Sequence, residues 1–313
     1  MDTSGKATQY LTAAAKLLIV AAAFYFIWNR LANDETLNPE MLRRRLDESF
    51  SAGSIAALLL LSFVNRFLEI LKWQNLVSSF KMISVPESSK QVLAALTVSI
   101  FTPNGIGEYG AKALFFEKAQ ARKIVFLNLV CNGIQMLLTI VFGIFGLLYF
   151  NSVYEILTPL TILYLFGGFC IVTAILSLMK KISIKGYSID KVVKKVNSIP
   201  QKIHRRNTVL AICRYLVFSH QYYLLFVILG VTLPYPLLMS IICSVYFLAS
   251  ALPTFQFLDF AVKGGVAVYF FGLAGVDEWI PIFVTTMMWL LNVVLPVVLG
   301  SYYVIRFKPK WKQ

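Results

Sequence analysis

Residues 91–118 read QVLAALTVSIFTPNGIGEYGAKALFFEK, and this stretch decides the architecture. It is apolar up to Phe101, breaks at the sequence TPNG (102–105), and resumes as an apolar segment that carries Glu108 and Lys112. Because proline removes a backbone donor and glycine loosens the chain, a helix should stop and restart there. The stretch is too long for one membrane span and too short for two. It therefore predicts a re-entrant hairpin of two half-helices, with its broken backbone shielded by protein or water.

A second apolar region, residues 236–274, is interrupted in the same way. It is apolar to Ser250, breaks at LPT (252–254) and continues as FLDFAVKGGVAVYFF. Pro253 marks this break as Pro103 marks the first. Each break is followed by an acid and, four residues later, by a lysine: Glu108 and Lys112 in the first segment, Asp259 and Lys263 in the second. We interpret this correspondence as an internal repeat.

The rest of the chain is rich in long apolar runs. Of its 313 residues, 58% are hydrophobic and 14% are charged, whereas about a quarter of the residues of a soluble globular chain are charged. The further runs long enough to span a bilayer cover roughly residues 10–28, 52–71, 124–150, 159–179, 209–229 and 281–304. The sequence therefore predicts an all-α, polytopic integral membrane protein. We expect its first run to be a retained span rather than a cleaved signal.

The placement of charge predicts the orientation of the chain. The formal net charge is +14, and residues 180–206 hold nine basic residues against one acid, Asp190. By the positive-inside rule, this loop and the basic C-terminal tail face the cytoplasm. The connection 151–157 and the pair Asp277–Glu278 carry no Lys or Arg and fit the outside. The connection 30–50 has mixed charge and can also lie outside.

Within the basic loop, apolar residues recur at helical spacing with lysines between them: Ile189, Val192, Val193 and Val196. This pattern predicts a short helix lying on the anionic lipids of the cytoplasmic leaflet. A plain solvated linker is the alternative. Nucleic acid is not an expected partner, because the basic residues flank membrane segments and no nucleic-acid-binding module is visible.

Repeat and orientation together predict an inversion. With the N-terminus inside, the first span goes out and the second returns, ending near Lys72 and Lys81, so the hairpin 91–118 enters from the cytoplasm. In the second half, the span 159–179 comes in and the span 209–229 goes out, so the hairpin 236–274 enters from outside. The chain then consists of two membrane repeats, 1–157 and 158–313, with the same order of elements and opposite orientation. Inverted repeats with discontinuous helices that meet near the midplane are typical of secondary transporters.

Ionisable side chains inside a bilayer cost about 2.5–3.5 kcal/mol each on insertion scales, so each needs a reason. The acid and lysine of each hairpin can simply pair along one helix face, which is the structural alternative to a site. Arg66 and Arg214 can either snorkel to the cytoplasmic interface or line a polar cavity. Glu69 and His220 are also placed within spans. The candidate substrate-binding residues are Asn104, Gly105, Gly107, Glu108, Lys112, Asp259, Lys263, Arg66 and Arg214, with Pro103 and Pro253 as structural breaks.

Other motifs do not add a cofactor, a metal or a catalytic residue. Residues 105–110 match the dinucleotide fingerprint G-x-G-x-x-G, but they lie in an apolar membrane segment rather than in a βαβ unit. The glycines would still let a helix N-terminus approach a phosphate closely. The four cysteines lie in predicted spans without metal-ligand spacing, and we expect them to be small packing residues.

The stretch from Pro103 to Glu108, followed by an apolar helix, resembles the P-x-x-x-G-E signature of the lysylphosphatidylglycerol synthase transmembrane-region family. The approach NRFLEILKW (65–73) is also similar to the second span of that family. The second half keeps Pro253 and has Asp259 as its acid, without the glycines that the family often has there. The resemblance implies a flippase-like membrane protein of the bacterial cytoplasmic membrane. The placement of charge, rather than the resemblance, predicts that both termini are cytoplasmic. It does not imply lipid aminoacylation, because no aminoacyl-transferase domain is present in the sequence.

The expected function is translocation of a polar lipid or lipid-linked headgroup between leaflets, with a membrane phospholipid or lipid-linked headgroup as the partner. On this hypothesis the half-helix N-termini with Lys112 or Lys263 hold phosphate, while Glu108 and Asp259 meet an amine, sugar hydroxyls or a proton. Two other hypotheses stay open: an intramembrane lipid-modifying enzyme, and an accessory subunit of an envelope-assembly complex.

Overall fold

The computed structural model describes residues 49–161, 163–164, 167, 171, 174–175, 188–252 and 254–307. Several sequence predictions lie outside these residues, in whole or in part. They concern the first span (10–28), the connection 30–50, most of the span 159–179, the start of the basic loop, Pro253 and the C-terminal tail.

The described chain is helical, and its two halves present their elements in similar order. The first half contains α3 (Ala52–Val77), α4 (Val85–Ser99), α5 (Gly107–Ala113), the 3-10 turn η1 (Lys118–Gln120) and α6 (Ala121–Tyr154). The second half contains α8 (Ile189–Asn197), α9 (Gln201–Ile228), α10 (Tyr235–Ala251), η3 (Gln256–Leu258), α11 (Asp259–Leu273), α12 (Trp279–Trp289), the π turn η4 (Leu290–Val294) and α13 (Leu295–Arg306). No strand occurs among these residues, which contain only an isolated bridge between Pro103 and Phe255.

Five of the described helical segments are long and apolar enough to cross a membrane: 52–77, 118–154, 201–228, 256–273 and 279–306. The predicted spans 52–71, 124–150, 209–229 and 281–304 coincide with four of them. The protein is therefore an all-α, polytopic membrane protein, as the sequence predicts. The fifth segment is the second helix of the hairpin 236–274.

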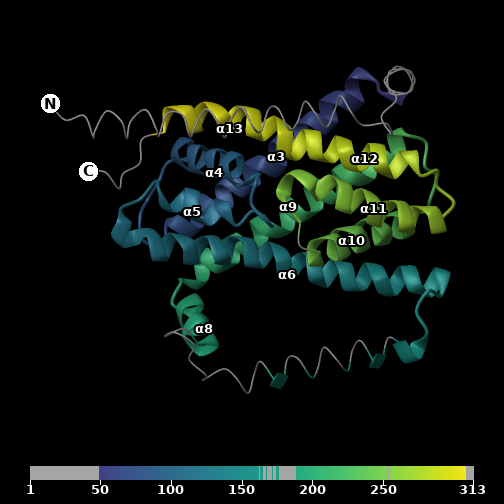
Figure 1. The fold of residues 1–313 in the computed structure, drawn as a ribbon, viewed down its shortest axis with the longest axis horizontal. Coiled ribbons are helices and arrows are strands. Elements are labelled where there is room, and N and C mark those ends of the chain that lie inside the picture. The colour runs from purple at the N-terminus through teal and green to yellow at the C-terminus, as the bar shows by residue number, and fades with distance from the viewer. Residues whose placement is uncertain are drawn as a thin grey trace.

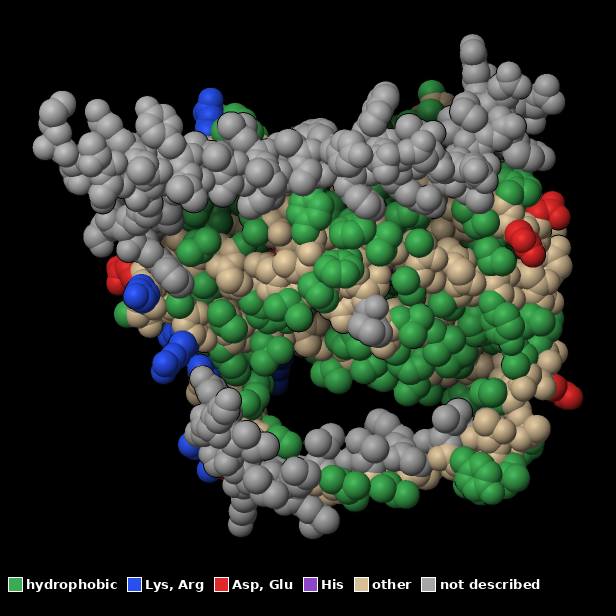
Figure 2. Space-filling model, viewed as in Figure 1, with side chains coloured by type: hydrophobic (Ala, Val, Ile, Leu, Met, Phe, Trp, Pro, Cys, Tyr) green, Lys and Arg blue, Asp and Glu red, His purple; other side chains and the backbone are tan. Residues whose placement is uncertain are grey.

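The two hairpins occupy opposite halves of the molecule. Helices α4 and α5 lie in the left half of Figure 1 and α10 and α11 in the right half, while α6 runs along the whole length. Figure 2 shows hydrophobic side chains over the middle of one face, with Lys and Arg toward the left end and Asp and Glu mainly at the right. The left end holds the start of α6, with Arg122 and Lys123, and the right end holds the connection between α11 and α12, with Asp277 and Glu278.

Small residues allow two pairs of helices to pack closely. Helix α6 packs against α10 at Gly143 and Gly146, where an added Cβ would overlap Phe247 and come within 2.7 Å of the Ser240 carbonyl oxygen. Helix α13 packs against α4 at Gly300, where a Cβ would overlap the Leu93 backbone. Such close contacts are typical of membrane helices, where dispersion forces rather than the hydrophobic effect hold helices together.

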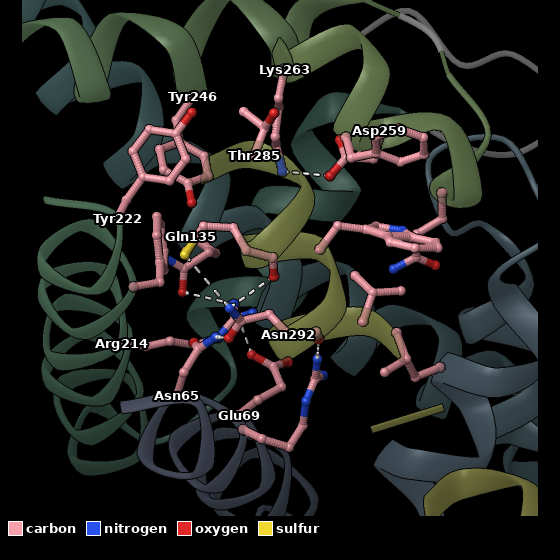
Figure 3. Close-up of a pocket in the computed structure, with 18 of the residues that line it drawn as sticks. Asn65, Glu69, Gln135, Arg214, Tyr222, Tyr246, Asp259, Lys263, Thr285 and Asn292 are labelled. Atoms are coloured by element: carbon pink, nitrogen blue, oxygen red, sulfur yellow. Dashed lines mark hydrogen bonds and ion pairs between the residues drawn. The ribbon is translucent and has the colours of Figure 1, made fainter. Parts of the chain in front are cut away.

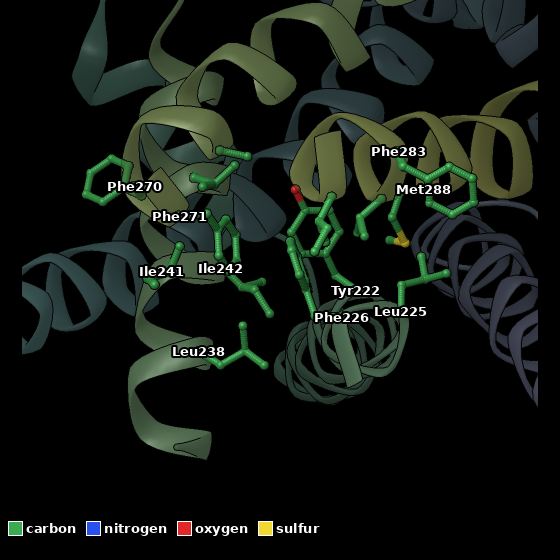
Figure 4. Packing of buried hydrophobic residues seen from close by; sticks show 14 of the residues in the cluster. Tyr222, Leu225, Phe226, Leu238, Ile241, Ile242, Phe270, Phe271, Phe283 and Met288 are labelled. Carbon is green, nitrogen blue, oxygen red and sulfur yellow. The ribbon is translucent and has the colours of Figure 1, made fainter. Parts of the chain in front are cut away.

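A hydrophobic core joins the helices of the second half. Figure 4 shows Tyr222 and Phe226 of α9 against Ile242 of α10, Phe271 of α11 and Met288 of α12. The rings of Phe226 and Phe271 are stacked with their centroids 4.0 Å apart. This packing fixes α11 and α12 relative to α9, and so positions the polar residues that these helices carry.

The two breaks meet each other. The amide of Asn104 donates to the carbonyl of Thr254 (2.8 Å), and the Asn104 side chain accepts from the Thr254 amide (3.1 Å). Asn104 and Gly105 have φ angles of 48° and 68°, a left-handed conformation that asparagine and glycine adopt most readily. The backbone groups freed by the breaks are thus partly satisfied by the opposite hairpin, which agrees with the prediction of shielding by protein.

Candidate polar cavity

Behind the two breaks lies a cavity of about 300 Å³. Its walls come from α3, α4, α5, α6, α9, α10, η3, α11, α12 and η4 (Figure 3). Six charged side chains among the described residues line it: Arg66, Glu69, Glu108, Arg214, Asp259 and Lys263. Neutral polar groups from several helices add to them, among them Gln135, Tyr246, Thr285 and Asn292 (Figure 3).

Glu69 of α3 is the centre of one charged cluster. Its Oε2 atom lies 3.1 Å from Lys72 Nζ and 3.1 Å from Arg214 Nη1, so one carboxylate is shared by two cations. The side-chain oxygen of Gln135 accepts from the same two cations, each at 3.3 Å. Cys131 lies on the far side of Glu69, with Sγ 3.5 Å from Oε1. The cluster fastens α3 to α6 and α9.

Arg66 belongs to a second group, built on a helix irregularity. Pro296 has no amide hydrogen, and the π turn η4 ends two residues before it, so carbonyl groups one turn back are left without a helical donor. Helix α3 supplies donors instead: Ser62 Oγ donates to the Leu291 carbonyl and Arg66 Nη2 to the Asn292 carbonyl, both at 2.5 Å. The guanidinium of Arg66 is thereby held against a neutral oxygen.

The side chain of Asn292 extends this group along one side of the cavity. Its Oδ1 atom accepts from Asn65 Nδ2 at 2.6 Å, and its Nδ2 atom donates to Gln221 Oε1 at 3.0 Å. Gln221 in turn donates to the Leu58 carbonyl at 3.0 Å. The result is a hydrogen-bonded connection between α3, α9 and η4 at one side of the cavity.

Both predicted acid and lysine pairs form, in different surroundings. Lys112 Nζ lies 2.5 Å from Glu108 Oε1 and donates to Asn128 Oδ1 at 2.7 Å, and the Lys112 side chain is completely buried. Lys263 Nζ lies 2.5 Å from Asp259 Oδ2, and both side chains are about a quarter exposed, at 26% and 28%. Glu108, Asp259 and Lys263 line the cavity, whereas Lys112 lies behind it.

The break residues position the cavity wall rather than line it. Gly107 leaves no room for a side chain, because a Cβ there would come within 2.8 Å of the Thr102 side chain, whose hydroxyl accepts from the Gly107 amide. Ser99 donates to Gln256 Oε1 at 2.9 Å, which connects the end of α4 to η3. Gln256 then lines the cavity. Asn104, Gly105 and Gly107 are thus not brought into the cavity itself, although they hold its wall together.

Several buried polar atoms of the lining have no hydrogen-bond partner among the described residues. They are Asn65 Oδ1, Arg66 Nε, Gln135 Nε2, Arg214 Nε, Tyr222 OH and Trp289 Nε1. Buried polar groups in proteins are nearly always paired, so a cluster of unpaired ones around one cavity needs an explanation. A polar ligand or bound water in the cavity is the simplest one.

The structure corrects one sequence prediction and bears on one alternative. Lys72 was expected at the cytoplasmic end of its span, but it is fully buried and paired with Glu69, because α3 continues to Val77. Arg66 and Arg214 both line the cavity, which favours the second of the two arrangements expected for them. Asn292 and Trp289 were not singled out from the sequence. The sequence signal available for Asn292 was Pro296, which lies four residues later in the same predicted span.

The described residues include no group of His, Cys, Asp and Glu side chains that could hold a metal ion. Cys131 and Cys243 are buried, and Cys213 is exposed on α9, each as a free thiol. The two histidines do not line the cavity: His204 contacts the Val196 carbonyl, and His220 contacts the hydroxyl of Tyr235.

Fold and site together define a polytopic α-helical membrane protein with a charged, partly unsatisfied cavity among its helices. Comparisons with protein families, curated proteins and solved structures found no match for this chain. Its function is therefore inferred from the chemistry of the cavity.

Proposed function

We propose that the protein moves a polar lipid or lipid-linked headgroup between the two leaflets of its membrane. The observation that carries this proposal is a charged cavity enclosed by helices whose outer faces are apolar. These faces carry exposed side chains such as Phe63 of α3 and Phe145 of α6. The barrier to lipid flipping is the transfer of a polar headgroup into hydrocarbon. A polar cavity at this position lowers that barrier while the acyl chains remain in the lipid.

The two halves of the chain serve this function best as inverted repeats. Pro86 and Pro236 are separated by the same 150 positions as Pro103 and Pro253. The helix contacts also correspond, since α4 packs against α13 as α10 packs against α6, and α3 packs directly against α9. A pair of inverted hairpins that meet at their breaks offers two alternative closures of one cavity, which is how alternating access operates in many transporters.

The orientation that we propose puts the basic end in the cytoplasm and the protein in the bacterial cytoplasmic membrane. Helix α8 extends from this end, begins at the cap Ser188 and carries exposed Ile189, Val192 and Val193 beside lysines. An amphipathic basic helix of this kind binds the anionic leaflet. Lys194 Nζ lies 2.8 Å from Asp190 Oδ2, and this hydrogen bond raises the pKa of the lysine. The resemblance of the motif from Pro103 to Glu108 to the lysylphosphatidylglycerol synthase transmembrane-region family favours the same proposal.

Reconstitution tests the function. Vesicles containing phospholipids with a fluorophore on one acyl chain are treated with a membrane-impermeant quencher, and loss of the protected inner-leaflet fraction reports translocation. We expect wild-type protein to translocate lipid, Arg214→Gln to be impaired, and Cys213→Ser to behave as wild type, because Cys213 is the exposed neighbour of Arg214 on α9.

The rival functions give different results in the same vesicles. A lipid-modifying enzyme would produce a new lipid species, detectable by mass spectrometry, without movement between leaflets. An accessory subunit would produce neither movement nor product. Either result, at verified incorporation and orientation of the protein, would refute the proposal.

A further inference from the structure

We infer that the cavity selects a doubly negative group, a phosphomonoester or a diphosphate, over a zwitterionic or cationic headgroup. That this group belongs to a lipid rests on the proposed function, whereas the preference for a multiply charged anion rests on the cavity alone. Three observations support it: the charge balance of the site, the engagement of its carboxylates, and the kind of polar atom that is left unpaired.

The charge balance of the site is positive. Among the described residues that line the cavity or pair with its lining there are five cations and three carboxylates, a surplus of two positive charges. The cations are Arg66, Lys72, Lys112, Arg214 and Lys263, and the carboxylates are Glu69, Glu108 and Asp259. A surplus of like charge inside a membrane protein is unfavourable unless an opposite charge compensates it.

The surplus is located on the α3 side of the cavity. Glu69 is shared between Lys72 and Arg214, so one negative charge serves two positive ones. Arg66 has no carboxylate within ion-pair distance among the described residues, and its hydrogen bond goes to the neutral Asn292 carbonyl. A dianion placed between Arg66 and Arg214 would neutralise the site.

The carboxylates offer little to a cationic ligand. Glu108 and Asp259 each contact a lysine at 2.5 Å, and Glu69 contacts two cations. An ammonium group would have to displace one of these lysines in order to find a counter-ion. The expectation that Glu108 and Asp259 receive an amine is therefore less favourable than an anionic ligand.

The unpaired atoms are mainly donors. Arg66 Nε, Gln135 Nε2, Arg214 Nε and Trp289 Nε1 can only donate, the Tyr222 hydroxyl can do either, and Asn65 Oδ1 alone can only accept. Trp289 and Tyr222 are 3% and 1% exposed, so these groups are not satisfied by bulk solvent. The terminal oxygens of a phosphomonoester accept several hydrogen bonds, and a guanidinium binds them in a bidentate geometry. A cavity of about 300 Å³ is at the lower end of the range of small-molecule sites, which suits a headgroup of this size.

Binding measurements on the full chain in nanodiscs test the inference. The probes are dioctanoyl phosphatidic acid (a phosphomonoester), dioctanoyl phosphatidylglycerol (a monoanionic diester), dioctanoyl phosphatidylcholine (a zwitterion) and inorganic pyrophosphate. We expect phosphatidic acid to bind roughly tenfold or more tightly than the other two lipids, since its phosphomonoester has a second negative charge and one more terminal oxygen to accept charge-assisted hydrogen bonds. Arg66→Gln should abolish this preference and Arg66→Lys should keep part of it. Arg122→Gln, at an exposed arginine at the start of α6, is the matched control and should not change it.

The outcomes separate the inference from the proposed function. Competition of pyrophosphate with phosphatidic acid would support an anion site that takes the phosphate itself, and selective binding without that competition would support a site that also needs the lipid. Equal affinity for all three lipids in the wild-type protein would overturn the inference, and this measurement needs no variant to fold. Equal affinities together with lipid movement in vesicles would leave the proposed function standing. Selective binding without any movement would instead refute the proposed function and keep the inference.

Discussion

Leucine variants of Glu108 and Lys112, singly and together, distinguish a structural salt bridge from a functional carboxylate. Lys112 is fully buried between the Glu108 carboxylate, the Asn128 side chain and the ring of Trp73, whose centroid is 4.3 Å from Nζ. Glu108→Leu leaves this ammonium without a counter-ion, which typically costs about 3–5 kcal/mol. The double variant removes the stranded charge and leaves only Asn128 short of a donor, at about 1–3 kcal/mol. We therefore expect the double variant to be more stable than Glu108→Leu.

Transport should respond differently from stability. Glu108 lines the cavity with 19% of its side chain exposed, whereas Lys112 is at 0%. We expect the double variant to fold and insert but to remain inactive, and Glu108→Gln to be inactive with a smaller loss of stability, because glutamine keeps an acceptor for Lys112. Thermal unfolding in detergent measures the stability of each variant, and lipid movement in vesicles at matched incorporation measures its transport.

The exposed pair Asp190 and Lys194 on α8 is the matched control. It has the same spacing of four residues, with 44% and 75% of the two side chains exposed. Removing both charges there should change neither the unfolding temperature nor transport, because exposed pairs contribute little. Full transport in the double variant of Glu108 and Lys112 would refute the role of Glu108 in the site and leave a structural salt bridge.

Three further changes test packing, the break and the orientation. Gly300→Leu should lower the unfolding temperature, because overpacking a close helix contact typically costs about 1–3 kcal/mol. Gly265→Leu on α11 is the control, because a Cβ there meets no atom within 4 Å. Equal effects of the two changes on the unfolding temperature would contradict the close packing at Gly300. Asn104→Ala should destabilise the protein more than Asn104→Gly, by roughly 1 kcal/mol, since only alanine has to be forced into a positive φ; the reverse order would contradict this. In a cysteine-free background, a cysteine at position 194 should react only from the cytoplasm and one at Ser152 only from outside. Labelling of position 194 from outside intact cells would overturn the orientation.

The positions of the helix breaks could be predicted because their cause is local. Proline and glycine act on the backbone of their own segment, so the sequence TPNG was enough to predict a break at residues 102–105. In the structure α4 ends at Ser99 and α5 begins at Gly107, on either side of it. The acid and lysine pairs are local as well, since residues four apart on a helix are neighbours. Periodicity in the basic loop likewise predicted α8, which covers residues 189–197.

The charged clusters could not be predicted because their partners are far apart in the chain. Glu69 and Arg214 belong to different halves, and only the packing of α3 against α9 brings them within 3.1 Å. Lys72 was misplaced for a different reason. A lysine near the end of an apolar run is usually taken as its boundary, whereas here Glu69, three residues earlier, neutralises it inside the bundle. The hydrogen bond from Arg66 to the Asn292 carbonyl depends on a π turn that no periodicity signals.

The cavity has two chemically different walls, and this difference bears on how a headgroup would lie in it. Helix α3 contributes Arg66 and Glu69, with Lys72 behind them, and α9 adds Arg214 beside Glu69. Apart from the Asp259 and Lys263 pair, the second half contributes mainly aromatic and hydroxyl groups, including Tyr222, Tyr246 and Thr285. A phosphate attracted to the surplus charge on the α3 side would leave the remainder of the headgroup against these rings and hydroxyls, which offer apolar surface together with hydrogen-bonding groups. The charged wall would then decide that a ligand is an anion, and the aromatic wall would decide which anion it is.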